Sequence, residues 1–189
     1  MTGKIIKGIA GFYYVHDGQA RVYQCRAKGV FRNRKIKPLV GDNVTFSVLD
    51  ETEGEGNIEE ILPRKNALIR PEVANVDQAL VLFAVRDPEP NLNLLDRFLV
   101  MMERAKVPVV LCFNKIDLCG QQQMDAYRKI YEAAGYPVKF ISAREQAGVA
   151  DIREFICGKT TVLAGPSGVG KSSLTNIIQP EADMETGGI

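Results

Sequence analysis

The sequence of 189 residues has no long hydrophobic segment. Its longest uninterrupted apolar run, Ala79 to Val85, has seven residues, whereas a transmembrane helix needs about 20. The first residues, Met1 to Lys7, contain no apolar stretch of the kind that marks a signal peptide. We therefore expect neither a membrane span nor a secretory leader.

The sequence is also poor in metal-binding and disulfide patterns. None of its four cysteines, which are Cys25, Cys112, Cys119 and Cys157, belongs to a C-x-x-C pair, and His16 is the only histidine. This argues against a structural zinc site in these residues. Cysteines within apolar patterns are usually reduced thiols, which indicates a cytoplasmic protein.

Large net charge is absent as well. Lys and Arg number 24 against 23 Asp and Glu, so the formal charge is +1. That balance excludes a strongly basic tail protein and an acidic solvating segment, and 46% hydrophobic residues suffice for a core. The charge is uneven, however, because residues 1–66 carry +3 and residues 67–189 carry −2.

The more basic first part has short β-type segments separated by turns. Apolar and aromatic residues are concentrated in 5–15, 20–25, 44–49 and 58–62, with Asp17-Gly18 and Gly41-Asp42 as turn dipeptides. About five short strands in so short a stretch favour a small closed barrel over a sandwich. A linker containing Pro63 and Pro71 follows, between Leu62 and Asn75.

The second part alternates apolar strands with amphipathic helices. Apolar runs occur at 79–85, 107–113, 138–141 and 161–164, and helical spacing of apolar residues occurs around 95–102, 124–134 and 149–156. This order predicts an α/β domain with a parallel sheet covered on both faces. We therefore divide the chain into a domain of residues 1–66 and a domain of residues 67–189.

The strongest motif is a phosphate-binding loop of the form G-x-x-x-x-G-K-[ST]. It lies between the strand 160–164 and a helix predicted over 171–178. Its glycines let backbone N–H groups approach phosphates at a helix N-terminus, while Lys171 would reach the β- and γ-phosphates and Ser172 would hold Mg²⁺. The loop residues are Gly165, Pro166, Ser167, Gly168, Val169, Gly170, Lys171 and Ser172.

Two further motifs indicate guanine. Asn114, Lys115, Ile116 and Asp117 directly follow a predicted strand, and the Asp117 carboxylate can accept from both N–H groups that guanine, unlike adenine, presents together. Asn114 would orient the loop and contact the base edge, while the Lys115 stem would cover the ring. After the next strand, the N–H of Ala143 in Ser142-Ala143 could donate to the guanine carbonyl.

The guanine motifs precede the phosphate loop, the reverse of ordinary small GTPases, so the chain resembles a circularly permuted GTPase. With its β-barrel, its Val40-Gly41-Asp42 and its double serine Ser172-Ser173, it is similar to the ribosome small subunit-dependent GTPase A (RsgA/YjeQ) family. The resemblance implies an OB-fold barrel and a cytoplasmic, monomeric enzyme. It also implies GTP/GDP and Mg²⁺ as ligands, and the 30S ribosomal subunit with its 16S rRNA as partner.

The family continues beyond the phosphate-loop helix into switch segments and a C-terminal zinc-binding domain. The sequence stops at Ile189, so we expect a piece of a longer protein, with Zn²⁺ bound only in the missing part. Lys171 is then the catalytic residue present. We expect little GTP turnover by residues 1–189, and we expect the strand 160–164 to pair with residues 78–85.

A basic stretch in the barrel is the candidate RNA-binding surface. Residues 21–38 contain no Asp or Glu, and Tyr23 and Phe31 are interleaved with the basic residues. Such a surface binds RNA mostly by phosphate neutralisation, although a solvated stretch balanced by the acidic run 50–60 remains the alternative. The candidates are Arg26, Lys28, Arg32, Arg34, Lys35 and Lys37.

Three functions fit these patterns to different degrees. The first is a GTP-hydrolysing factor in late maturation of the small ribosomal subunit. The second is an RNA-binding nucleotide switch with negligible hydrolysis. The third, an ATPase or small-molecule kinase, conflicts with the guanine-type motif at Asn114 to Asp117.

Overall fold

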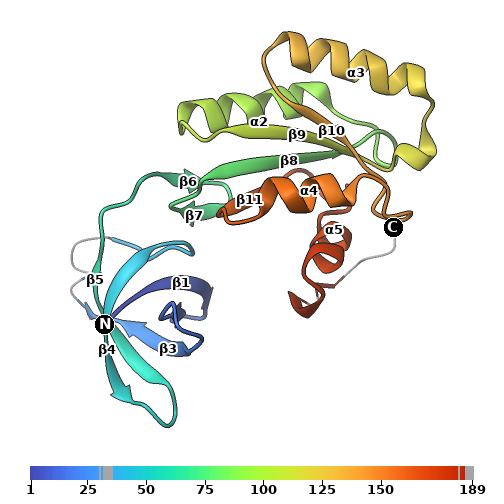
Figure 1. Cartoon of the computed structure of the whole chain (residues 1–189). Helices are drawn as coiled ribbons and strands as arrows, with labels where there is room; N and C mark the ends of the chain where they lie inside the picture. Colours follow the sequence, from blue (N-terminus) through green and yellow to red (C-terminus); the bar gives the residue numbers. More distant parts are fainter. Residues whose placement is uncertain (30, 32–35, 183, 186–189) are drawn as a thin grey trace. The chain divides into compact units, whose positions relative to one another are not determined.

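The computed structural model describes residues 1–29, 31, 36–182 and 184–185. The chain forms two compact units, Met1–Val76 and Asp77–Ile189 (Figure 1). Each unit has its own hydrophobic core. The sequence-based division starts the second domain at residue 67, whereas the contacts of the chain assign residues 67–76 to the first unit.

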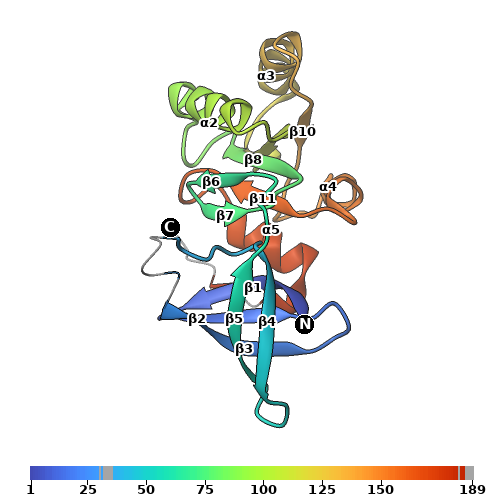
Figure 2. The same cartoon turned by 90° about the vertical axis from the view of Figure 1, so that its left-hand side faces the viewer.

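The first unit is built around a closed barrel with the strand order β1-β2-β3-β5-β4 (Figure 2). Neighbouring strands run antiparallel except β3 and β5, which are parallel. Inward side chains such as Ile5, Phe46 and Ile58 are buried, which confirms the predicted small barrel. The strands are β1 (Thr2–Ile9), β2 (Phe12–His16), β3 (Val22–Ala27), β4 (Asn43–Asp50) and β5 (Glu55–Ile61).

A tight turn at Ala10-Gly11 separates β1 from β2. Both residues have positive φ, 49° at Ala10 and 86° at Gly11, as a two-residue hairpin turn of type I′ requires. Alanine rarely adopts this conformation, and the pair lacks the usual Asn-Gly or Asp-Gly signature. The apolar pattern of residues 5–15 therefore predicts one β-rich segment, whereas in the structure these residues belong to two strands, β1 and β2.

The stretch predicted as a linker folds into a hairpin of β6 (Ala67–Ile69) and β7 (Glu72–Ala74). Asn66 closes its base, since its Nδ2 donates to the Val76 carbonyl at 2.8 Å and its Oδ1 accepts from the Val76 N–H at 2.9 Å. Asn75 adds bonds from the Lys65 N–H and to the Gly41 carbonyl. These side-chain bonds close the base of the hairpin and tie it to Gly41.

A buried carboxylate holds the turn before β4. Asp42 is fully buried, and its two oxygens accept from Nε and Nη2 of Arg64 at 2.7 and 2.8 Å. One of these oxygens also accepts from the Leu39 N–H. A buried charge needs such partners, so the Val40-Gly41-Asp42 motif has a clear structural role in this unit.

The second unit contains a parallel sheet with the order β10-β9-β8-β11. Every residue of β8 and β9 is buried, as expected for strands covered on both sides. β11 pairs with β8 from Thr161 opposite Gln78 to Ala164 opposite Val81, as predicted. The strands are β8 (Gln78–Ala84), β9 (Val109–Asn114), β10 (Val138–Phe140) and β11 (Thr161–Ala164).

Helices cover the two faces of this sheet, which confirms the predicted α/β architecture. In Figure 1, α2 and α3 lie on one side of the strands, and α4 and α5 lie on the other. Ile152 of α4 and Leu174 of α5 pack with Leu82 and Cys112 in the core. The helices are α2 (Leu92–Arg104), α3 (Gln121–Ala133), α4 (Val149–Ile156) and α5 (Lys171–Ile178), with short 3₁₀ turns η1 (Ile116–Leu118) and η2 (Pro180–Ala182).

Candidate functional site

The phosphate-loop motif connects β11 to α5 at the carboxyl edge of the parallel sheet. Gly165 has φ 152°, and a Cβ there would lie 2.1 Å from the Leu82 carbonyl oxygen. Gly170 has φ 95°, and a Cβ there would lie 2.3 Å from Nδ2 of Asn114. Both positions thus require glycine, because the loop lies directly against Leu82 of β8 and Asn114 of β9.

Lys171, the first residue of α5, turns its side chain back into the loop. Its Nζ donates to the Gly165 carbonyl at 3.0 Å and also to the Pro166 carbonyl. Burial lowers the pKa of Lys171, because desolvation disfavours the charged form. The Lys171 ammonium is therefore held inside the loop by two of the loop's own carbonyls.

The remaining loop residues complete the turn between β11 and α5. Val169 is buried, Ser167 is exposed and Gly168 has φ 78°. Ser172 and Ser173 are half-buried in the first turn of α5. The described residues contain no group of three His, Cys, Asp or Glu side chains arranged for a metal ion.

Asn114, the last residue of β9, joins the three sequence motifs. Its side chain is 2% exposed. Its Nδ2 donates to the Val169 carbonyl in the phosphate loop at 2.8 Å, and its Oδ1 accepts from the Ala143 N–H at 2.9 Å. Asn114 thus contacts both the phosphate loop and the Ser142-Ala143 loop, while its expected contact with a base edge stays a prediction. The Ala143 N–H, expected to serve a guanine carbonyl, is bonded within the protein in this structure.

Asp117 lies in η1, beside the loop that contains Ser142. The Ser142 hydroxyl donates to Oδ1 of Asp117 at 2.7 Å and accepts from the Glu145 N–H at 3.1 Å. Ile116 is fixed through its N–H, which donates to the Ile141 carbonyl at 3.2 Å. The structure thus brings the Asp117 and Ser142-Ala143 motifs into direct contact.

Lys115 has a partner that the sequence analysis missed. The residue adopts φ 65°, and its Nζ donates to the backbone carbonyl of Asp87. Asp87 follows β8, so it lies at the same carboxyl edge of the sheet as the motifs that follow β9 and β11. The position of Asp87-Pro88 in the loop that follows the buried strand β8 was the available clue, because ligand sites of open α/β sheets are formed by such loops.

The predicted RNA-binding residues Arg26, Lys28 and Lys37 are exposed, but each already has a partner within the protein. Lys28 pairs with Glu59, as the alternative of a basic stretch balanced by the acidic run anticipates. Lys37 pairs with Glu72. The Arg26 guanidinium lies over the Phe12 ring, with 4.9 Å from Cζ to the ring centroid. Arg32, Arg34 and Lys35 lie outside the described residues.

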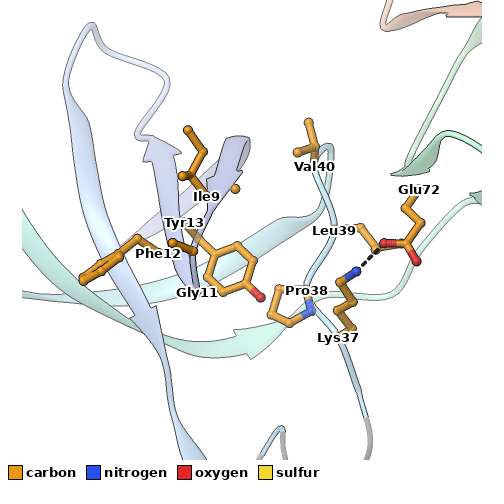
Figure 3. Close-up of a pocket in the computed structure, with 11 residues that line it drawn as sticks. Ile9, Gly11, Phe12, Tyr13, Lys37, Pro38, Leu39, Val40 and Glu72 are labelled. Atoms are coloured by element: carbon orange, nitrogen blue, oxygen red, sulfur yellow. Dashed lines mark hydrogen bonds and ion pairs between the residues drawn. The ribbon is translucent and has the colours of Figure 1, made fainter.

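The Lys37–Glu72 pair closes one side of a hollow of about 270 Å³ in the first unit (Figure 3). The β1–β2 turn forms another wall, and the Tyr13 ring points toward Pro38. The lysine ammonium is already compensated by a carboxylate there. Lys37 is therefore a weaker candidate for phosphate binding than its sequence context indicates.

No helix in the described part of the chain combines the length and the apolar character needed to cross a membrane.

Comparison with known proteins gives consistent matches over the whole chain. The chain is 55% identical to the small ribosomal subunit biogenesis GTPase RsgA of Agathobacter rectalis, covering 100% of this chain and 66% of the relative. It is 49% identical to the protein of the same name from Alkaliphilus metalliredigens, covering 98% and 63%. The chain thus spans about two thirds of the length of these relatives.

Two solved structures share the fold. The crystal structure of YjeQ from Thermotoga maritima aligns with a TM-score of 0.82 and 37% identity, covering 95% of this chain and 65% of that one. The structure of YloQ, described as a circularly permuted GTPase, aligns with a TM-score of 0.76 and 45% identity, covering 95% and 64%.

The family models complete the comparison. The model described as RsgA N-terminal domain matches residues 2–56, and the model described as RsgA GTPase matches residues 61–189. The permuted order of the motifs predicts the same assignment, and the chain belongs to the RsgA GTPase family.

Proposed function

We propose that this chain binds GTP at the carboxyl edge of its parallel sheet, and that the protein hydrolyses it to GDP during late maturation of the small ribosomal subunit. The names of the relatives support the biological role. The observation that carries the nucleotide part is the bridge through Asn114, because one buried carboxamide ties the phosphate loop to the Ser142-Ala143 loop.

The phosphate end of the nucleotide lies, in this proposal, in the loop from Gly165 to Gly170. Lys171 exchanges its two backbone carbonyl partners for phosphate oxygens, and the backbone N–H groups at the start of α5 supply further donors. The partial desolvation of Lys171 strengthens its attraction to an anion. Ser172 and Ser173 complete this end of the site with hydroxyl groups.

The donor set fits a magnesium ion shared between protein and nucleotide. Mg²⁺ prefers oxygen ligands, keeps several waters and seldom uses an all-protein cage. The Ser172 hydroxyl, next to Lys171 in the first turn of α5, suits such a site. When bound, Mg²⁺ neutralises charge on the β- and γ-phosphates.

The guanine end lies against Asn114, Lys115, Ile116 and Asp117. The Ser142 hydroxyl donates to one oxygen of Asp117 and fixes the carboxylate, which keeps acceptor sites on both oxygens for the two N–H groups of the base. The bond from Lys115 to the Asp87 carbonyl holds its stem across this edge of the sheet. We assign the Ala143 N–H to the base carbonyl, which requires it to share or exchange its bond to Asn114 when nucleotide binds.

Competition binding with a fluorescent GTP analogue tests the nucleotide part. We expect unlabelled GTP and GDP to displace the analogue and ATP to fail at comparable concentration. Lys171→Ala should weaken binding at least about tenfold through loss of a charge-assisted contact. Lys129→Ala, on the exposed side of α3, is the matched control. Equal displacement by ATP would refute guanine recognition.

We further propose that the barrel contacts ribosomal RNA of the small subunit, which places the protein in the cytoplasm. The excess of basic residues in residues 1–66 supports this. Replacing Arg32, Arg34 and Lys35 together with alanine should weaken RNA binding and reduce its salt dependence, because fewer counterions are released. Unchanged affinity and salt slope would limit this stretch to a solvated surface.

A further inference from the structure

The outer face of β2, β3 and β5 carries an ordered array of polar and aromatic side chains. Along β3, Gln24 and Arg26 alternate with the buried Tyr23 and Cys25, so both point away from the barrel core. Strand register then aligns two rows across the sheet. We call this face the barrel platform; its rows are Phe12, Arg26 and Asn57, and Tyr14, Gln24 and Glu55.

Arg26 is already stacked in this array. Its guanidinium lies 4.9 Å from the Phe12 ring centroid, and the side chain is otherwise exposed. A planar guanidinium held on one aromatic ring presents its second face to solvent, which suits stacking of a further planar group. The next row has a similar pair, with Lys7 Nζ 5.6 Å from the Tyr14 ring centroid.

Hydrogen-bonding groups flank the stacked guanidinium. Asn57 lies opposite Arg26 in the register, and Gln24 lies two residues away on the same face. Within the part of the chain that the structure describes, neither carboxamide has a side-chain hydrogen bond. Each offers both donors and an acceptor, and Glu55, opposite Gln24, adds an acceptor-only carboxylate.

A hollow of about 350 Å³ lies among these side chains, within the usual size of small-molecule sites. Its floor includes the backbone of the buried Gly56. Leu49 forms part of the wall and is 64% exposed, next to a register shift between Val48 and Asp50. The hollow therefore combines a stacking surface, an apolar wall and unpartnered carboxamides.

We infer that the barrel platform binds an unpaired RNA base, which stacks on the free face of Arg26 and is recognised by Asn57, Gln24 and Glu55. This inference rests on the proposed contact between barrel and RNA, and it specifies that contact. Lys28 and Lys37, which phosphate binding would use, are paired with carboxylates. We therefore expect base stacking and hydrogen bonds to the base edge to contribute more to RNA affinity at the barrel platform than charge does.

The hydrogen-bonding groups of Asn57, Gln24 and Glu55 also favour one base over another. A carboxamide forms paired bonds with the amino group and adjacent ring nitrogen of adenine. Glu55 accepts from an amino group and repels the carbonyl oxygen that uracil has at the corresponding position. We therefore expect single-stranded adenine-containing RNA to bind better than uracil-containing RNA, and a duplex, whose bases are stacked and paired, to bind worst.

Fluorescence anisotropy with the full chain tests this preference. The probes are labelled oligo(A) and oligo(U) of about eight nucleotides, a typical site size for one barrel, and a duplex of equal length. At a fixed salt concentration, oligo(A) should bind about tenfold more tightly than oligo(U). Glu55→Gln supplies a donor and should narrow this difference by improving oligo(U) binding.

The variant Arg26→Lys keeps the charge and removes the planar stacking surface. It should weaken oligo(A) binding about tenfold. The same exchange at Arg21, which does not line the hollow, is the control and should change little. Both variants should give the same circular dichroism spectrum and urea unfolding midpoint as the unmodified chain, which shows that the barrel is folded.

The outcomes separate this inference from the broader proposal. If the three probes bind equally and Arg26→Lys has no effect while added salt weakens binding, RNA binding stands and base recognition is overturned. If no RNA binds at all, both are overturned while GTP binding is judged by its own test. Selective, Arg26-dependent binding of oligo(A) supports the inference.

Discussion

The geometry of the candidate nucleotide site depends most on Asn114, whose buried carboxamide joins two loops. Replacing it with alanine leaves the Val169 carbonyl and the Ala143 N–H buried without their partner. Each unsatisfied group costs about 1–3 kcal/mol, so Asn114→Ala should lower the free energy of unfolding by about 3 kcal/mol and weaken GTP binding. Urea unfolding and nucleotide titration measure the two effects.

Asn93→Ala is the matched control for this loss. Asn93 is exposed on α2, and exposed substitutions usually change stability by less than about 0.5 kcal/mol. If Asn114→Ala lost no more stability than Asn93→Ala, the two hydrogen bonds would not be formed in solution.

The identity of the bound base can be tested by replacing one carboxylate oxygen of Asp117 with an amide nitrogen. In Asp117→Asn the side-chain oxygen can still accept from the Ser142 hydroxyl, so the loop is retained. The new amide donates where the carboxylate accepted, which mismatches guanine and matches xanthine. We expect GTP affinity to fall at least about a hundredfold and XTP to bind better than GTP. A folded variant that still preferred GTP would remove Asp117 from base recognition.

At the scale of elements, the β6–β7 hairpin packs closely on the barrel at Gly41. A Cβ on Gly41 would lie 2.0 Å from the Ala74 carbonyl oxygen, and φ there is 92°. The Ala74 N–H also donates to the Val40 carbonyl at 2.9 Å. Gly41→Ala should therefore lower the free energy of unfolding by about 3 kcal/mol, measured by urea unfolding followed by circular dichroism.

Gly18→Ala separates steric overlap from backbone strain. Gly18 has φ 85° but no atom within 4 Å of an added Cβ, so only the conformational cost of about 1–2 kcal/mol for alanine at positive φ remains. Equal losses at Gly18 and Gly41 would mean that the hairpin yields to the added methyl group without cost.

The elements of the second unit were predictable because each leaves a periodic pattern. Strands buried on both faces, such as β8, give continuous apolar runs, while α2 repeats Leu95, Leu99 and Met102 on one face. The Ala10-Gly11 turn and the β6–β7 hairpin leave no such pattern. The turn is defined by positive φ values at both of its residues, and the hairpin is held by asparagine side chains that bond to backbone groups far along the chain.

The candidate site was predictable to the extent that local motifs define it. The phosphate loop and the Asn114 to Asp117 segment have fixed spacing, whereas the bond from Lys115 to Asp87 joins residues 28 positions apart. Likewise, the carboxylates that pair with Lys28 and Lys37 are 31 and 35 positions away. Such partners depend on strand order and register, which composition does not encode.

At the scale of the whole molecule, each unit contains a buried thiol within its own core. Cys25 packs with the barrel core, and burial raises its pKa to about 11. Cys112 lies in β9 within the core of the second unit, and burial raises its pKa as well. Because the thiolate is the reactive form, both react only when their unit opens, whereas Cys157 is exposed.

Thiol labelling followed by peptide mass spectrometry therefore reports the opening of each unit separately. Cys157 should react first, with Cys25 and Cys112 much slower. A ligand that binds only the folded form reduces opening in proportion to its concentration over Kd, so GTP at a hundred times Kd should slow Cys112 labelling about a hundredfold. Cys25 should be slowed less, because the proposed nucleotide contacts all lie in the second unit. Equal slowing of Cys25 and Cys112 would show that both units open in one cooperative step, and unchanged Cys112 labelling would place the nucleotide outside the second unit.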